Sequence, residues 1–110
     1  MEHAAFWLPS WLHGLDYTGK LFRDRKRGEW PSEVARRHLK FSPFAGEPVG
    51  WIMENVGSDL LVFASDYPHP EGTSDPIAKF EATMTECDAA ARDAFYHGNM
   101  EDLMGIQLPR

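Results

Sequence analysis

Residues 60–65, LLVFAS, constrain the fold more than any other stretch of the chain. Apolar side chains follow one another without alternation, so both faces of an extended segment here would be apolar. Such a pattern is typical of a strand in a parallel sheet that is covered on both sides. We therefore predict a buried parallel strand and a fold of the α/β class.

Helical and extended patterns alternate around this strand. The first three helices are expected from about Ser10, over PSEVARRHL, and between Pro48 and Gly57. Two more are expected over SDPIAKFEATM, with Asp75 as N-cap, and over DAAARDAFYHG, which ends at Gly98. A last turn begins at Asn99. Two further strands are expected in the apolar run near the start and in HLKFSPF. Three parallel strands leave open edges, so the pattern indicates a slice of a larger α/β structure.

Charge is unevenly distributed over the 110 residues, whose net charge is -6. The segment from Lys20 to Lys40 carries eight basic and three acidic residues, a local +5. The basic run KLFRDRKRG is either a nucleic-acid patch or a solvated loop. Asp24 and Glu29 interrupt it and the remaining chain would repel phosphate, so we favour the loop and expect no nucleic-acid partner.

Cysteine content and hydropathy bear on the compartment. Cys87 is the single cysteine, so no internal disulfide can form, and no base adjoins it to activate it as a nucleophile. We expect a cytoplasmic protein, since that compartment is reducing. No signal peptide and no membrane span is expected, because no apolar run approaches the ~20 residues that a span needs.

A polar constellation, SDYPHP, follows the predicted strand. Asp66 comes where the strand ends, and ligands of α/β proteins bind at the carboxyl ends of parallel strands. A carboxylate there can bind a divalent metal or accept a proton from metal-bound water, and His69 could touch substrate. In the alternative interpretation, Asp66 caps a turn and His69 is solvated. Spacing alone slightly favours that alternative.

Three segments resemble the C-terminal part of the amidohydrolase-related family, metal-dependent TIM-barrel hydrolases and decarboxylases of the aminocarboxymuconate semialdehyde decarboxylase type. They are FASDYPHPEG, GEPVGWIMENVGSD and FYHGNMEDLMGI. In addition, HAAFWLP is similar to the family's sixth-strand motif, His-Gly-Gly-x-x-x-Pro, with Ala4 and Ala5 in place of the glycines. The resemblance implies that Asp66 is a metal ligand and proton-transfer group, and that His3 is an acid/base group.

By this resemblance, residues 1–110 form one segment: about strands six to eight, with their helices, of a (β/α)8 TIM barrel. That barrel is incomplete, since closure takes roughly 250 residues. The resemblance further implies a small-molecule substrate, a pocket that Tyr67, His69 and Trp7 line, and a divalent metal, zinc before others, in the complete enzyme.

The family's His-x-His metal-binding pair has no counterpart among the five histidines. One carboxylate does not hold a catalytic metal, which takes about three protein ligands. We therefore expect the chain alone to hold no metal, to be inactive, and to be marginally stable or self-associating. Three hypotheses stay open: part of a metal-dependent hydrolase or carboxy-lyase, a half completed by a second chain or a homo-oligomer, and a non-catalytic binding module.

Overall fold

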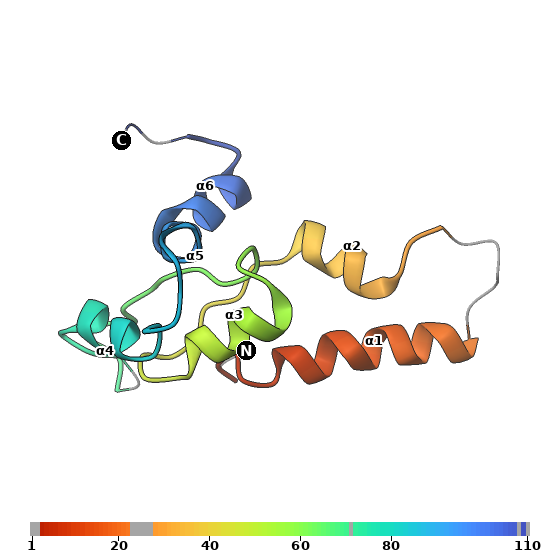
Figure 1. Ribbon diagram of the computed structural model, residues 1–110, viewed down its shortest axis with the longest axis horizontal. Coiled ribbons are helices and arrows are strands. Elements are labelled where there is room, and N and C mark those ends of the chain that lie inside the picture. Colours follow the sequence, from red (N-terminus) through yellow and green to blue (C-terminus); the bar gives the residue numbers. More distant parts are fainter. Residues whose placement is uncertain (1–2, 23–27, 71, 108, 110) are drawn as a thin grey trace.

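The computed structural model describes residues 3–22, 28–70, 72–107 and 109, so most of the basic run KLFRDRKRG lies outside the described residues. The elements in order are α1 Leu8–Phe22, α2 Pro31–His38, α3 Val49–Val56, α4 Pro76–Ala82, α5 Ala89–Asp93, the π-helical turn η1 Ala94–Gly98, and α6 Asn99–Met104. In Figure 1, α1 and α2 form a hairpin on one side of α3, while α4, α5 and α6 lie on the other side.

Local signals place the central helices as predicted. Pro31 begins α2 and Pro76 begins α4 after Asp75, because proline is preorganised for the first helical turn and has no N–H to leave unpaired there. The helix α3 lies between Pro48 and Gly57, as expected. The helix α1 begins at Leu8, two residues before the predicted start.

The prediction of three strands is wrong for the described residues. They contain one isolated parallel bridge, between Phe41 and Leu61, in which the Phe41 N–H donates to the Leu60 carbonyl and its carbonyl accepts the Val62 N–H, both at 2.9 Å. The next donor of this ladder belongs to Pro43, which has no N–H, so pairing stops there. The apolar run near the start forms a turn and then enters α1.

The predicted break at Gly98 is also wrong. Gly98 has helical angles, φ -59° and ψ -41°, and α5, η1 and α6 form one continuous helical stretch. The stretch ends at Gly105, whose φ of 68° is the left-handed conformation that glycine adopts without strain. The π-helical turn Ala94–Gly98 presents the Phe95 carbonyl to the Phe63 N–H, at 3.0 Å. Asn99 therefore continues a helix instead of opening one.

Two groups of aromatic rings fill much of the core. Phe63, Phe80, Phe95 and Tyr96 pack with ring centroids between 5.0 and 6.1 Å apart. The second group is Trp7, Trp11 and Phe41, which meet edge to face at 5.6–6.0 Å. Apolar side chains from α1, α3 and the segment 60–62 join the two groups into one cluster.

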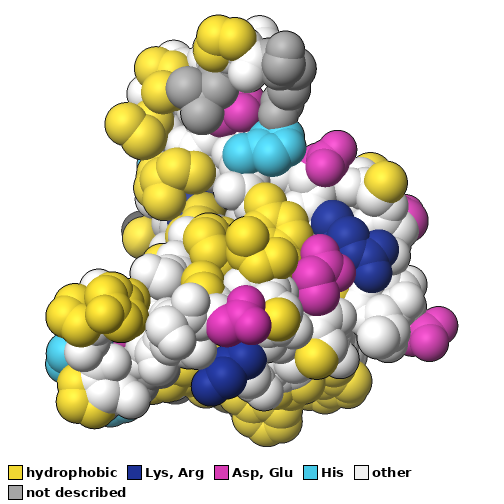
Figure 2. All heavy atoms as spheres, turned by 90° about the vertical axis from the view of Figure 1, so that its left-hand side faces the viewer, with side chains coloured by type: hydrophobic (Ala, Val, Ile, Leu, Met, Phe, Trp, Pro, Cys, Tyr) yellow, Lys and Arg dark blue, Asp and Glu magenta, His cyan; other side chains and the backbone are white. Residues whose placement is uncertain are grey.

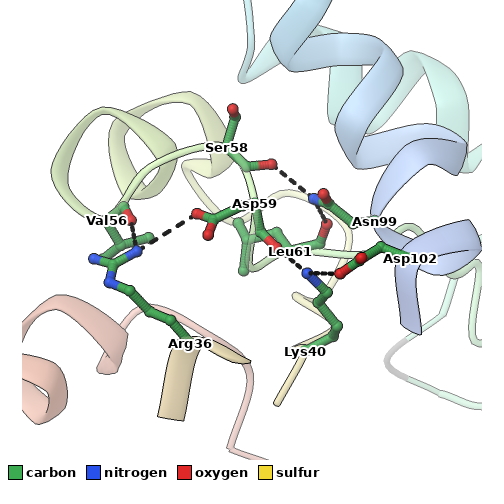
Figure 3. Close-up of polar contacts among 8 residues, drawn as sticks. All are labelled: Arg36, Lys40, Val56, Ser58, Asp59, Leu61, Asn99 and Asp102. Atoms are coloured by element: carbon green, nitrogen blue, oxygen red, sulfur yellow. Dashed lines mark hydrogen bonds and ion pairs between the residues drawn. The ribbon is translucent and has the colours of Figure 1, made fainter. Parts of the chain in front are cut away.

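A buried amide attaches the C-terminal helical stretch to the segment after α3 (Figure 3). The Asn99 side chain, 6% exposed, donates to the carbonyls of Ser58 and Leu61, each at 2.7 Å. Lys40 lies beside it and reaches Asp102 on α6, with Nζ 3.0 Å from the carboxylate. These contacts fix α6 against both partners of the single β-bridge.

Arg92 organises the connection between α4 and α5. Its guanidinium lies 2.9 Å from the Glu81 carboxylate and donates to the carbonyls of Met84, at 2.7 Å, and of Cys87. The hydrogen bond with Glu81 raises the pKa of Arg92, so the guanidinium stays charged. Burial raises the pKa of Cys87, which keeps this cysteine a protonated, weakly reactive thiol at neutral pH.

The Tyr96 hydroxyl beside this network is buried and has no hydrogen-bond partner of ordinary geometry among the described residues. Burial, and secondarily the nearby Glu81 carboxylate, raise the pKa of Tyr96 to about 12. In the unfolded chain the phenol ionises near pH 10. Between these values the unfolded state has lost a proton that the folded state keeps, so folding stability falls as the pH rises.

Tyr96→Phe should remove this alkaline loss of stability. Without the substitution, the phenol contributes a loss of about 1 kcal/mol by pH 11. Urea unfolding of both proteins between pH 7 and 11 measures the difference, and parallel curves across the whole range would contradict the prediction.

The overall shape is elongated, with principal extents of 48 × 31 × 26 Å and a radius of gyration of 15.3 Å. A compact domain of this length has a radius of gyration of about 13 Å. The α1–α2 hairpin accounts for the long axis (Figure 1). Large apolar side chains remain more than half exposed on it and on α6: Tyr17, Leu21, Leu103 and Met104.

Candidate functional site

The candidate site is the loop formed by residues 65–70 and by Gly72 and Thr73, directly after the extended segment that follows Leu60. Three backbone hydrogen bonds close it: His69 N–H to Asp66 at 2.8 Å, Gly72 N–H to His69 at 2.9 Å, and Thr73 N–H to Ser65 at 3.3 Å. Asp66 itself has a φ of 53°, a left-handed conformation that aspartate tolerates better than most residues. The loop is therefore a defined turn that holds the Asp66 backbone in place.

Gly72 makes this closure possible. A Cβ atom at this position would lie 2.3 Å from the Asp66 carbonyl oxygen and 2.8 Å from that of Ser65. Both are backbone atoms that cannot rotate away. A larger residue at this position must therefore displace the loop that carries Asp66.

Gly72→Ala should open this loop without unfolding the core. We expect hydrogen exchange at the His69 and Thr73 amides to become about tenfold faster or more, because their bonds close the loop. Gly14→Ala is the matched control: nothing lies within 4 Å of its added methyl in α1, so it should stabilise by about 0.5–1 kcal/mol. Unchanged exchange at His69 and Thr73 in Gly72→Ala would contradict the close approach.

Asp66, Tyr67 and His69 meet on this loop and face solvent. The His69 Nδ1 lies 3.6 Å from the Asp66 carboxylate, and the two side chains are 45% and 51% exposed. A pair this exposed contributes little to stability. Tyr67 is 68% exposed beside it.

The other two predicted residues lie on the N-terminal segment. His3 is exposed, and the described residues show no hydrogen bond or ion pair between it and Asp66. Trp7 is half-buried, donates its indole N–H to the Ala4 carbonyl at 2.9 Å, and packs in the core. These packing contacts are enough to account for the position of Trp7. The role of His3 in catalysis and that of Trp7 in substrate binding stay predictions.

Glu47 is the anchor of that segment. Its carboxylate accepts hydrogen bonds from the backbone N–H groups of Ala5, Phe6 and Phe44 at 2.7–3.1 Å. Sequence reasoning did not assign this role to Glu47. The available signal was a carboxylate directly after the turn at Ala45–Gly46, a place where backbone N–H groups need side-chain acceptors.

The residues present do not fit a complete metal site. No group of three or more His, Cys, Asp or Glu side chains within the described ranges could hold a metal ion. Asp66 and His69 offer two donors, whereas a catalytic zinc takes three protein ligands. The described residues alone therefore do not assemble a catalytic metal site.

A separate open groove of about 700 Å³ lies between α3 and the α4–α5 connection. Trp51, Met53 and Cys87 contribute to its wall, and Glu54, Glu86 and Asp88 make it acidic. None of the Asp66 loop lines it, so the groove and the loop are different features of the surface. No described helix is long and apolar enough to cross a membrane.

Comparison with known proteins defines the fold. No protein-family model matches the sequence, and no curated protein matches it significantly. Among solved structures, the chain is similar to an amidohydrolase from Mycobacterium avium subsp. paratuberculosis K-10, with a TM-score of 0.75 and 22% sequence identity. The match covers 97% of this chain and 27% of that protein.

The chain thus has the fold of part of an amidohydrolase and spans about a quarter of the length of the protein it resembles. A likeness at this identity establishes the fold alone. It agrees with the coarse prediction that the chain forms part of an α/β barrel.

Proposed function

We propose that the chain is the C-terminal portion, about strands six to eight with their helices, of a metal-dependent amidohydrolase-type (β/α)8 barrel. The likeness to part of an amidohydrolase over 97% of the chain supports the architecture. The Asp66 loop supports the chemistry, because an exposed carboxylate follows directly on an extended apolar segment and its backbone is held by the Gly72 contact.

In this proposal Asp66 provides one metal ligand or carries a proton, and His3 is the second acid/base group. Tyr67, His69 and Trp7 line the pocket for a small-molecule substrate. The remaining metal donors, for zinc before other divalent ions, come from polypeptide outside the described residues, on a second chain or another copy. The protein acts in the cytoplasm, and alone it is inactive.

The reaction class is hydrolysis, with decarboxylation as the alternative within the same kind of site. A non-catalytic binding module is the second candidate. The two-donor set of Asp66 and His69 favours it, since such a pair can contact a ligand without assembling a complete metal site.

A chimeric protein tests the proposal. The part of the Mycobacterium avium amidohydrolase that matches this chain is replaced by the chain, and metal is measured by elemental analysis. One divalent ion per chimera is expected, with loss of that ion in Asp66→Ala. Asp75→Ala is the matched control, because Asp75 is an exposed carboxylate before α4 whose side chain makes no capping hydrogen bond.

Full metal occupancy in the Asp66→Ala chimera would refute the role of Asp66. Stoichiometric metal in the isolated chain would refute the dependence on donors from elsewhere. A chimera that folds without any metal, in a parent background that binds one, would favour the binding module.

A further inference from the structure

We infer that the groove between α3 and the α4–α5 connection binds an aliphatic polyamine, a linear cation in which ammonium groups alternate with short methylene chains. The groove offers about 700 Å³ of space, which lies within the range of about 300–1,000 Å³ that is typical of small-molecule sites. Both of its walls belong to this chain. The inference therefore goes beyond the proposed function and does not depend on it.

Carboxylates line both walls of the groove. Glu54 lines it from α3, while Glu86 and Asp88 line it from the α4–α5 connection. The exposed carboxylates of Glu54 and Glu86 take part in no hydrogen bond or ion pair with the described part of the chain. One oxygen of Asp88 accepts the Ala91 N–H at 2.8 Å, which leaves the other for a ligand. No basic side chain among the described residues lines the groove, so its negative charge is not neutralised.

The negative charge of both walls acts on Cys87, which lies at the contact between them. A Cβ atom at Gly50 of α3 would lie 3.4 Å from the Cys87 Sγ, so the thiol packs against that helix. Burial is the main cause of the raised pKa of Cys87. The carboxylates of Asp88 and Glu54 raise this pKa further, against an opposing effect of Arg92. Carboxylates from the two walls therefore converge on one part of the groove.

An aromatic surface adjoins these carboxylates. Trp51 lines the groove three residues before Glu54 on α3, a spacing that places both side chains on the same side of the helix. The indole is 45% exposed and stacks on Phe6, with ring centroids 5.2 Å apart and an interplanar angle of 21°. The stack holds the indole in place. Trp rings attract ammonium groups, and the same ring offers apolar surface to methylene groups.

The spacing of the carboxylates favours a polyamine over a metal ion. No group of three or more His, Cys, Asp or Glu side chains in the described ranges could hold a metal ion, so the carboxylates of the groove lie too far apart to share one. A polyamine carries its ammonium groups several bonds apart and can reach carboxylates on both walls. Its methylene groups meanwhile contact the apolar part of the lining.

The charge around the groove also favours a polycation. Residues 47–110 carry twelve acidic and three basic residues. Figure 2 shows the face on which α4 lies, where Asp and Glu side chains are more widespread than Lys and Arg side chains. A field of this sign attracts a polyamine and repels ligands that carry phosphate.

Isothermal titration calorimetry of the chain with spermidine tests the inference, with hexaamminecobalt(III) as a compact cation of the same charge. Spermidine should bind one site per chain about tenfold more tightly than the cobalt complex, because only the polyamine contacts carboxylates and indole together. Glu54→Gln and Glu86→Gln should each weaken spermidine binding about two- to fivefold. Asp75→Asn is the matched control: it removes the same charge from an exposed position outside the groove and should leave binding unchanged.

Trp51→Leu separates the aromatic contact from charge. The variant keeps an apolar side chain but loses the ring, so spermidine should bind about two- to fivefold more weakly while hexaamminecobalt(III) binds as before. Unchanged spermidine binding in Trp51→Leu would overturn the inference. Equal affinity for the two cations, or an effect of Asp75→Asn as large as those of the groove variants, would also overturn it, since either result reduces binding to general charge attraction.

A trilysine peptide, which has the same net charge as spermidine, distinguishes a polypeptide partner from a polyamine. We expect the peptide to bind more weakly, because its charges are on separate flexible side chains. Binding of trilysine about tenfold more tightly than spermidine would assign the groove to a basic polypeptide and overturn the inference. All of these failures leave the proposed function standing, since that proposal is decided by the metal bound at Asp66 in the chimera.

Discussion

Phe95→Ala is expected to destabilise the protein by about 3–5 kcal/mol, the range for a large aromatic side chain removed from a closed core. Phe95 is fully buried, with its ring centroid 5.0 Å from Phe80 and 5.2 Å from Tyr96. Small domains have only about 5–15 kcal/mol of stability in total, so this loss removes a large part of it.

Urea denaturation followed by circular dichroism measures this loss. Phe95→Leu is the control, because it keeps most of the apolar volume and should cost about 1–2 kcal/mol. Equal midpoints for the alanine and leucine variants would show that the aromatic cluster is not closed around Phe95, contrary to its burial.

Asn99→Asp should be at least as damaging as Asn99→Ala, although aspartate has nearly the same shape as asparagine. The Asn99 amide donates to two carbonyls, those of Ser58 and Leu61. Alanine leaves both acceptors unpaired at a cost of about 2–4 kcal/mol. In aspartate a carboxylate oxygen replaces the Nδ2 that donates to both carbonyls, so two attractions become repulsions unless the carboxyl group is protonated.

The two variants separate hydrogen bonding from packing. Stability from urea midpoints at pH 7 should rank the parent above Asn99→Ala, with Asn99→Asp equal to Asn99→Ala or below it. At pH 4 the aspartate variant should recover part of its loss, because a protonated carboxyl donates once. An aspartate variant as stable as the parent would mean that the packing of the Asn99 side chain, and not its hydrogen-bond donation, holds the helical stretch against residues 58–61.

The helices could be predicted because their signals are local. Pro31, Pro76 and Gly57 act on their own backbone angles, whatever the distant chain does. The break at Gly98 could not be predicted correctly, since the contacts of Phe95 and Asn99 with residues 58–63 hold the helix through the glycine. Strand pairing depends on partners far along the chain, and Pro43 together with missing neighbours leaves one bridge where the apolar pattern predicted strands.

The residues of the candidate site also differ in whether local sequence or distant contacts determine their positions. Asp66, Tyr67 and His69 are close in sequence, so a motif of four residues was enough to bring them together. His3 and Trp7 depend on how the N-terminal segment docks, and that is set by Glu47, whose three backbone donors are 3 to 42 residues away. A short sequence motif cannot predict contacts between residues that are so far apart in the sequence.

The Trp7–Trp11 pair gives the docked N-terminal segment an optical signature. The two indole rings lie 5.6 Å apart and almost perpendicular, at 83°. Transitions of aromatic rings so close together and held at a fixed angle couple, and the coupling appears as a paired band of opposite signs in the circular dichroism spectrum. Because Glu47 holds the backbone just before Trp7, the amplitude of that band reports the docking of this segment without an added label.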